Sequence, residues 1–286
     1  MIMDVYQGSN HMRRKIANAV MLGLAGLATA LAILLLFSVL GYVLIQGGSA
    51  INLDFFTQLP KPVGEPGGGM ANAIVGTLIL LGIASLIALP IGIGAGIYLA
   101  ELGSGRLGTT VRFVTDVLTG IPSITIGIFA YTLLVLPMRS FSTLAGGFAL
   151  AIIMIPTVTR ATEEMLKLVP SSLREASLAL GIPYWKTVLR VVVPAAMGGI
   201  VTGATLAVAR AGGETAPLLF TAFGNHFWSL SLNRPIAALP LQVFVYAISP
   251  YDDWRAQAWA GALVLVGMVL VINLVARFFV RGTRMQ

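Results

Sequence analysis

Residues 175–214 read EASLALGIPYWKTVLRVVVPAAMGGIVTGATLAVARAGGE, and this stretch decides the fold. Its first half is a polar segment with basic flanks, which is too hydrophilic to cross a membrane. Its second half is an apolar helix that carries Arg210 and Glu214. The chain is therefore organised around a junction between a water-exposed helix and a membrane span that contains charge.

The polar half contains the signals of a short helix. Ser171 or Ser172 can cap it, and Glu175 then falls in the first turn, where the helix dipole favours an acidic residue. Gly181 can adopt the left-handed conformation that ends a helix, and Pro183 prevents the helix from continuing. We expect a helix of about two to three turns. These signals alone fit an ordinary surface helix between two spans equally well.

Composition identifies the chain as an integral membrane protein. Hydrophobic residues make up 57% of the 286 positions and charged residues only 10%, against roughly 25% charged residues in soluble domains. The net charge of +7 does not indicate a nucleic-acid partner, because the basic residues border apolar runs instead of forming one surface. Cysteine is absent, and His11 and His226 lie far apart without carboxylate partners, so we expect no metal site.

Long apolar runs predict an all-α protein with six transmembrane helices. The third run is interrupted at Gly120-Ile121-Pro122, and Asp116 is expected at the membrane interface. Residues 46–70, rich in proline and glycine, are expected to form an irregular exposed loop, and residues 224–255 a second loop. The expected spans are residues 17–45 and 71–99, the interrupted run that ends at Pro137, and residues 144–159, 191–223 and 256–280.

The distribution of lysine and arginine orients these six spans. An even number of spans places both termini on one side, and thirteen of the 18 basic residues lie on that side with residues 160–190. The opposite side holds four, and Arg210 lies inside a span. Because basic residues accumulate in cytoplasmic connections, both termini and residues 160–190 are expected in the cytoplasm.

The fifth span carries the ionisable pair Arg210 and Glu214. At about 1.5 Å per residue, Arg210 lies roughly 28 Å along the helix, near or beyond mid-depth. Gly212, Gly213 and Pro217 weaken the helix at this level, as in transporters that expose backbone groups to a substrate. Charge at such depth is costly and by default marks a pathway. A neutral Arg–Glu pair that locks two helices together is the alternative.

An arginine in such a passage suits an oxyanion. The guanidinium group can meet two phosphate oxygens at once and stays charged in a low-dielectric environment, whereas a lysine could lose its proton. Glu214 would keep Arg210 from holding the anion too tightly, because a pathway must also release what it binds. The pair therefore predicts a passage for a phosphate-like anion.

A motif at the start of the stretch points to a family. Glu175-Ala176-Ser177 is followed after three residues by Gly181, and after nine more by a hydrophobic turn that ends at Pro194. This spacing resembles the loop that binding-protein-dependent ABC importer permeases present to their ATPase, with small, conservative departures. The resemblance implies the type I ABC importer permease fold with a cytoplasmic coupling helix. The ATPase-coupling residues would be Glu175, Ala176, Ser177, Gly181 and Pro194.

Three further segments narrow the resemblance. Residues 209–222 read ARAGGETAPLLFTA, residues 116–124 read DVLTGIPSI, and residues 64–69 read GEPGGG. They are similar to the A-type permease subunit of the bacterial high-affinity phosphate transporter, the PstA family, and the similarity covers essentially residue 13 to the end. It implies a pathway for inorganic phosphate formed by Arg210, Gly212, Gly213, Glu214 and Thr215.

The resemblance also implies an assembly in the bacterial inner membrane. The chain would form half of the translocation pathway beside a second, related permease subunit. Two ATP-binding subunits would hold ATP and Mg, and a periplasmic phosphate-binding protein would deliver the anion; membrane lipid is expected as a partner and nucleic acid is not. The chain contains no Gly-rich Gly-Lys-Ser/Thr loop, so it is not expected to be an enzyme or to hold a cofactor.

The expected domains follow from these assignments. Residues 1–16 are a cytoplasmic tail, and residues 17–70 hold the first helix and a periplasmic loop. Residues 71–280 are the permease domain with the coupling segment at 160–190, and residues 281–286 are a second cytoplasmic tail.

Three other functions are weighed against this one. A permease for another oxyanion, such as molybdate or sulfate, would share most of these features. A free-standing secondary transporter would show internal repeats and several acidic groups within spans, but only Glu214 is clearly inside one. An intramembrane enzyme would need a nucleophile and base at depth, and the sequence offers no such pair.

Overall fold

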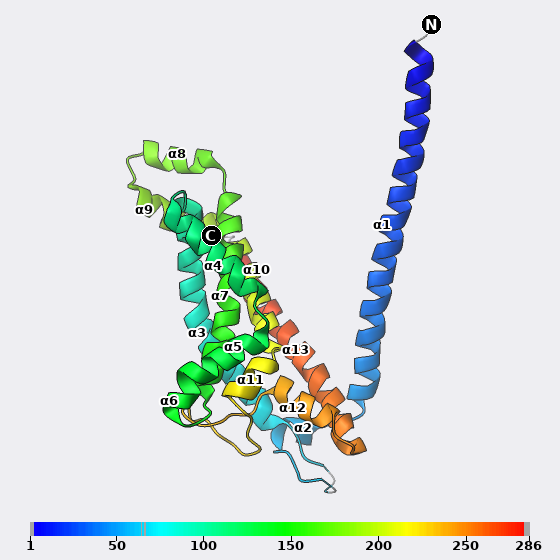
Figure 1. Ribbon diagram of the computed structural model, residues 1–286, viewed down its shortest axis with the longest axis vertical. Helices are drawn as coiled ribbons and strands as arrows, with labels where there is room; N and C mark the ends of the chain where they lie inside the picture. Colours follow the sequence, from blue (N-terminus) through cyan, green and yellow to red (C-terminus); the bar gives the residue numbers. More distant parts are fainter. Residues whose placement is uncertain (1–2, 64, 66, 283–286) are drawn as a thin grey trace.

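The computed structural model describes residues 3–63, 65 and 67–282, and within them the chain is almost entirely helical. One isolated bridge between Phe223 and Ile236 is the sole β-type pairing of the described residues. Five helices are long and apolar enough to cross a membrane, and a bent pair becomes the sixth if it counts as one span (Figure 1). The prediction of an all-α membrane protein is thereby confirmed, and the six predicted spans correspond to five single helices and one bent pair.

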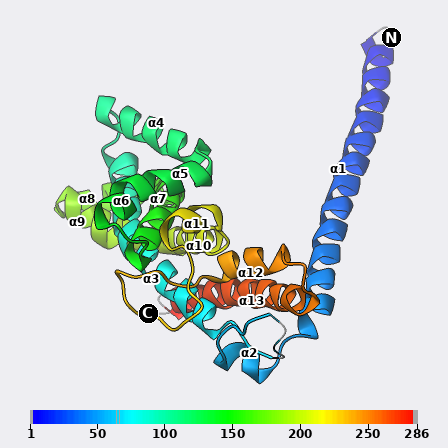
Figure 2. The ribbon, with the colours of Figure 1, turned by 60° about the horizontal axis from the view of Figure 1, so that its bottom comes forward.

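The first helix, α1 (Met3–Gly48), stands apart from the rest of the molecule (Figures 1 and 2). It meets the body at one end, where Gly47 lies against the backbone of Trp259 and the ring of Tyr42 packs edge-on to the Trp259 ring at 5.1 Å. Its apolar side chains between residues 12 and 39 are exposed. The helix is longer at both ends than the predicted residues 17–45.

Helices α3 (Ala71–Glu101) and α7 (Thr143–Lys167) form the centre of the fold. Glycines allow them to pack closely, because a Cβ atom on Gly92 would lie 2.8 Å from Cβ of Val158, and one on Gly96 2.5 Å from Cβ of Thr162. Helix α7 begins as predicted but continues eight residues past residue 159. Residues 160–167, expected within the coupling segment, are therefore the last turns of a core helix.

The third predicted span is broken. Helix α4 (Arg106–Gly120) and the run from α5 (Ser123–Ala130) through η1 (Tyr131–Val135) to α6 (Leu136–Met138) meet at 103°. The break falls at the predicted Gly-Ile-Pro sequence, where Ile121 and Pro122 are extended and the helix cannot continue. Helix α5 packs beside α11 (Ala216–Thr221), with Gly127 against the backbone of Pro217.

The fifth predicted span, residues 191–223, is wrong at both ends. Its helix starts earlier, with α9 (Tyr184–Thr187) and the π-helical turn η2 (Val188–Val192) leading into α10 (Val193–Gly212). It also ends earlier, because the N–H groups of Gly213 and Glu214 donate to carbonyls only three residues back, at Arg210 and Ala211. These tight turns close the helix, and α11 follows as a separate element.

The two predicted loops contain structure. Helix α2 (Leu53–Thr57) lies in the first and α12 (Leu239–Ala247) in the second, ahead of the last helix, α13 (Asp252–Gly282). Phe55 and Tyr246 are fully buried in a core shared with α13. The expectation that these connections are exposed loops is wrong, because their aromatic and aliphatic residues form a cap over this end of the helices.

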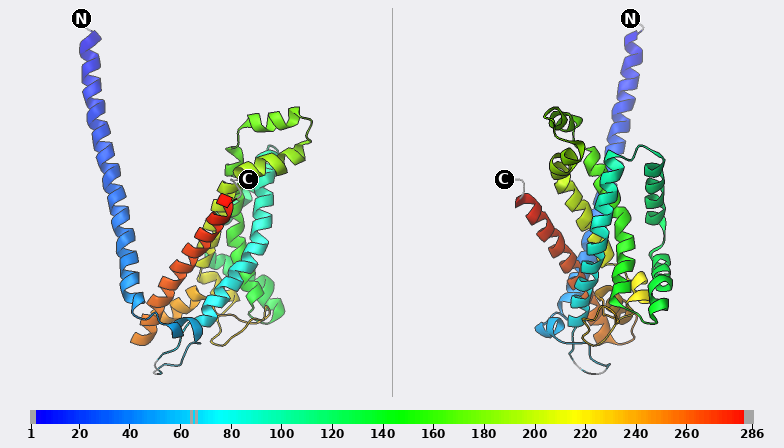
Figure 3. Two further views of the ribbon diagram at one scale, coloured as in Figure 1. Left: turned by 180° about the vertical axis from the view of Figure 1, so that it is seen from behind. Right: turned by 90° about the vertical axis from the view of Figure 1, so that its left-hand side faces the viewer.

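The opposite end carries the segment between α7 and α10. Figure 3 shows this segment on the same side of the molecule as the start of α1 and the end of α13. This common side agrees with the arrangement that an even number of spans predicts. Of the expected tails, residues 1–2 and 283–286 lie outside the described residues.

Candidate functional site

The predicted short helix is present as α8 (Ser171–Ala179), nine residues long. Gly181 has a φ of +75°, the left-handed conformation expected after its end, and α9 begins directly after Pro183. The capping prediction is wrong: Pro170 occupies the N-cap, and neither serine side chain caps the helix. Glu175 consequently lies beyond the first turn.

One face of the α8–α9 loop, defined as residues 168–187, is open to solvent. Glu175 and Ala176 are exposed, as are the large apolar side chains of Leu180 and Trp185. A short helix with apolar side chains exposed around an acidic residue suits docking to another protein. Pro194, the last of the predicted coupling residues, is exposed in the first turn of α10.

Ser177 differs from its neighbours because it faces inward. Its side chain is buried, and its hydroxyl lies 2.9 Å from the Thr187 hydroxyl of α9. The Ser177 carbonyl also accepts a hydrogen bond from the N–H of Ile182. Ser177 therefore fixes the angle between α8 and α9, whereas Glu175 and Ala176 are available to a partner.

The second predicted site lies at the break between α10 and α11, and we call residues 210–215 the charged break. The Nε atom of Arg210 is 3.9 Å from a carboxylate oxygen of Glu214, too far for a hydrogen bond. Among the described residues, Glu214 is the one charged partner of Arg210, whose side chain is 48% exposed. The guanidinium group thus keeps most of its donors available.

The other members of the charged break shape its backbone. Gly212 is buried and ends α10, while a Cβ on Gly213 would come no closer than 3.7 Å to another residue. Thr215 precedes α11, and its hydroxyl donates to the carbonyl of Pro240 in α12 at 3.4 Å. The structure places Arg210 and Gly212 at the end of α10, and Gly213, Glu214 and Thr215 in the break before α11.

A third cluster was not identified from the sequence. The carboxylate of Glu163 on α7 is fully buried and contacts Arg112 of α4 at 2.6 Å, Arg160 at 2.9 Å and Lys167 at 2.9 Å. Arg160 also pairs with Asp116 of α4. The i, i+3 and i+4 spacing of Arg160, Glu163 and Lys167 was the available signal, since such pairs face each other on a helix.

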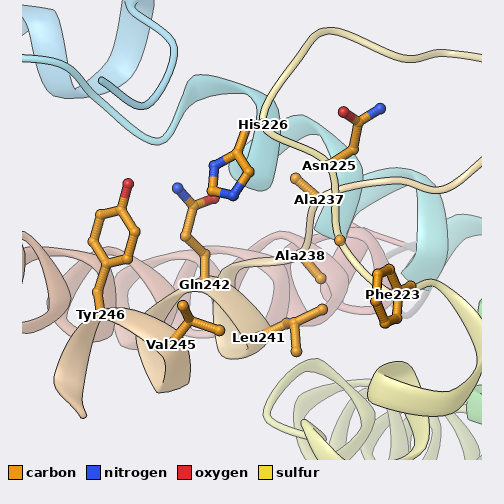
Figure 4. A pocket seen from close by; sticks show the side chains of 10 residues that line it. Phe223, Asn225, His226, Ala237, Ala238, Leu241, Gln242, Val245 and Tyr246 are labelled. Carbon is orange, nitrogen blue, oxygen red and sulfur yellow. The ribbon is translucent and has the colours of Figure 1, made fainter. Parts of the chain in front are cut away.

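The end of the molecule opposite α8 contains a cavity of about 170 Å³ between the α11–α12 connection and α12 (Figure 4). Gln242 and Tyr246 are buried, and the polar ends of both side chains point into it. None of its ten lining residues is an arginine or lysine. The lining is mainly apolar with a few neutral polar groups, so the cavity lacks the cationic donors that would hold an anion.

The described residues contain no cluster of three or more histidine, cysteine, aspartate or glutamate side chains that could hold a metal ion. Of the clusters found, the charged break offers an arginine with unused donors, and the α8–α9 loop offers an exposed docking face. The first can attract an anion, and the second can receive force from a partner.

Comparison with known proteins places these features in one family. The family described as binding-protein-dependent transport system inner membrane component matches residues 92–285. The phosphate transport system permease protein PstA of Yersinia pestis is 48% identical over 81% of this chain and 79% of its own. PstA of Haemophilus influenzae is 45% identical over 93% and 94%, and PstA 1 of Mycobacterium tuberculosis H37Rv is 38% identical over 93% and 88%.

Solved structures show the same fold at lower identity. A chain of the MetNI methionine ABC transporter, in a structure described as inward facing, superposes with a TM-score of 0.62 at 20% identity. The match covers 75% of this chain and 97% of that one. An amino acid ABC transporter gives a TM-score of 0.52 at 18% identity. The fold is therefore that of an ABC importer permease.

Proposed function

The chain belongs to the binding-protein-dependent transport system inner membrane components and, among these, to the PstA phosphate permeases, and from this premise we propose that it forms half of a translocation pathway for inorganic phosphate. A member of this family is the multi-pass permease of an ABC importer and is not itself an enzyme. ATP hydrolysis belongs to a partner subunit.

The proposal rests on the position of Arg210 and on its available hydrogen-bond donors. Arg210 is held at the end of α10 with one partner at 3.9 Å, so an incoming oxyanion does not have to displace an existing hydrogen bond. Its planar fork can donate two hydrogen bonds to a phosphate, and both are strengthened by charge. Glu214 remains close enough to compete for the guanidinium group, which favours release of the anion.

The surroundings of the pair support passage more than structural locking. A locking pair would be buried and mutually hydrogen-bonded, because burying charge without hydrogen bonds is costly. The side chain of Arg210 is instead about half exposed, and no described side chain fixes its orientation. Thr215 and the uncrowded position of Gly213 would leave a neutral, open approach beside the charge.

The assembly that we propose contains a second, related permease subunit, two ATP-binding subunits and a periplasmic phosphate-binding protein. ATP and Mg would be held by the ATP-binding subunits. The complex would lie in the bacterial inner membrane with both termini of this chain and the α8–α9 loop in the cytoplasm. Support comes from the exposed face of that loop and from its position on the side of the termini.

The decisive experiment is uptake of radiolabelled phosphate by cells or proteoliposomes carrying Arg210→Gln. We expect uptake to fall to background while the subunits still co-purify. Arg255→Gln is a matched control, because the Arg255 side chain is 49% exposed and also pairs with a carboxylate on its own helix. Wild-type uptake by Arg210→Gln, with an intact complex, would refute the pathway role.

The identity of the anion needs its own measurement. A guanidinium group recognises sulfate and molybdate by the same hydrogen bonds as phosphate. Uptake of labelled phosphate is therefore measured with each unlabelled anion in excess. Competition by phosphate alone supports the proposal, and selective competition by sulfate or molybdate would assign the chain to a different oxyanion.

A further inference from the structure

The side of the molecule that carries the termini contains two arginines in reciprocal positions. Arg112 of α4 donates to the carbonyls of Leu99 and Gly103 at the end of α3, each at 2.7 Å. The same guanidinium group donates to the buried carboxylate of Glu163 on α7. Arg112 thereby satisfies the free carbonyls of one core helix and pairs with an acid on the other.

Arg174 of α8 makes the reverse set of contacts. It donates to the carbonyls of Leu166 and Val169 at the end of α7, at 3.0 and 2.7 Å. It also binds the carboxylate of Glu101 on α3 through two nitrogens, at 2.7 and 3.3 Å. We call Arg112, Arg174, Glu101 and Glu163 the arginine clamp, because each arginine joins the ends of α3 and α7.

Only one arginine of the clamp belongs to the α8–α9 loop. Through Arg174, α8 is fixed directly to both core helices. The hydroxyl of Tyr184 on α9 donates a hydrogen bond to the carboxylate of Glu101 at 2.6 Å. Both helices of the loop therefore contact this carboxylate. The Glu101 side chain is 4% exposed, and a buried, bidentate pair of this kind resists exchange with water.

The connection of the same loop to α10 is different. It runs along the chain through the π-helical turn η2, and Pro194, two residues after η2, cannot donate a backbone hydrogen bond. Across space the contact is apolar, because Val192, Ala196 and Ile200 pack in one core with Leu166 and Val169. A π-helical turn near a proline is a typical site of bending, and packed apolar helices can slide past one another. Force applied to α8 therefore meets a directional, polar connection toward α3 and α7 and an apolar one toward α10, the helix that carries Arg210.

We propose that Arg174 and Glu101 are positioning residues for transport, which fasten the α8–α9 loop to α3 and α7 so that these three parts move as one body during the ATPase cycle. The inference rests on the proposed function, because it assumes that a partner ATPase pushes the loop. Relative motion then occurs between this body and α10, at η2. The charged break would open or close as a result.

The first test separates coupling from docking. Complexes with Arg174→Gln or Glu101→Gln are purified and reconstituted, and phosphate transported per ATP hydrolysed is measured together with co-purification of the ATPase. We expect the ATPase to remain bound and active while transport per ATP falls by about tenfold, within the usual range of coupling energies. Arg174→Lys keeps the charge but not the fork and should fall between wild type and Arg174→Gln.

Arg106→Gln is the matched control, because Arg106 is an exposed basic residue at the start of α4, outside both the clamp and η2. It should keep the wild-type ratio. An unchanged ratio in Arg174→Gln and Glu101→Gln would overturn the proposal, and so would an equal loss in Arg106→Gln. If the proposed function itself is wrong, the wild-type complex transports no phosphate, an outcome that differs from a reduced ratio.

A second test uses the absence of cysteine from the chain. Glu101→Cys and Arg174→Cys are combined and joined with a short bifunctional thiol reagent, in a complex whose other subunits have no accessible cysteine. Before joining, transport per ATP should be low, as in Arg174→Gln. A covalent link should restore it, because the proposal requires these positions to stay together. Verified cross-linking that blocks transport or leaves it low would show that they separate during the cycle.

Discussion

Arg174 and Arg210 are the same residue type in opposite situations. Arg174 donates to two backbone carbonyls and holds a buried carboxylate with two nitrogens, whereas Arg210 has one acidic partner at 3.9 Å. A guanidinium group whose donors are used becomes a structural fastener. One whose donors are free is a binding group. The comparison indicates that local hydrogen-bond saturation, not residue type, separates the rigid end of this molecule from its proposed anion-binding site.

The largest stability effect is expected in the clamp, at Glu163. Glu163→Gln removes the carboxylate shared by Arg112, Arg160 and Lys167, and we expect it to lower the free energy of unfolding by about 3 kcal/mol, since a broken buried pair leaves charge uncompensated. Unfolding of the purified chain in mixed micelles measures the change. Glu164→Gln is the control, because Glu164 is 60% exposed; equal losses in both variants would contradict the ranking.

A smaller effect is expected where the core helices touch. Gly96→Ala places a Cβ atom 2.5 Å from Thr162, so α3 and α7 must separate, at a cost of about 1–3 kcal/mol. Gly213→Ala, in the charged break, meets no atom closer than 3.7 Å and should cost less than about 1 kcal/mol. The same unfolding assay compares the two glycines. A larger loss at Gly213 would show that the break is as tightly packed as the core.

Ser177→Ala is expected to cost about 1 kcal/mol, because the Thr187 hydroxyl loses a buried partner. Replacing both residues, with Ser177→Ala and Thr187→Val, removes the unsatisfied group and should recover much of the loss. A double-mutant cycle measured by unfolding isolates the contribution of this contact. Additive effects would mean that the two hydroxyls do not hold α8 against α9.

The smallest stability effect is expected at Arg210. Its single, half-exposed ion pair should contribute less than about 1 kcal/mol, so Arg210→Lys should unfold like wild type. Its phosphate uptake should nevertheless fall clearly, because a lysine cannot present the planar fork. Thermal unfolding and uptake are measured on the same preparation. Wild-type uptake with reduced stability would reverse the contrast between the two arginines.

The sequence allowed much of the fold to be predicted because its strongest signals are local. Apolar run length located the spans, Gly120 and Pro122 marked a true break, and Gly181 ended α8 in the left-handed conformation. Long-range packing was not visible in this way. The residues of α2 and α12 were expected to lie in loops. These helices are stabilised by burial of Phe55 and Tyr246 against α13, which the proline-rich composition does not reveal.

The candidate site was predictable in part for the same reason. The charged break follows from two ionisable residues in an apolar run, so Arg210 and Glu214 could be identified directly. The clamp could not, because Arg112 and Glu163 are 51 residues apart and Glu101 and Arg174 are 73 apart. From the sequence, Arg112 and Arg174 contributed only to the count of basic residues that orients the spans. The fifth span was predicted to continue to residue 223. Helical periodicity does not show that tight turns at Gly213 and Glu214 end the helix earlier.

The contact between α1 and α13 has a consequence for biosynthesis. It joins the first span to the last, through Gly47, Tyr42 and Trp259. A nascent chain would insert α1 into the bilayer early, yet its docking surface is translated only at the end. This contact must therefore form late, after the other helices have been inserted. A chain whose synthesis stops before residue 259 would lack the part of α13 against which α1 packs.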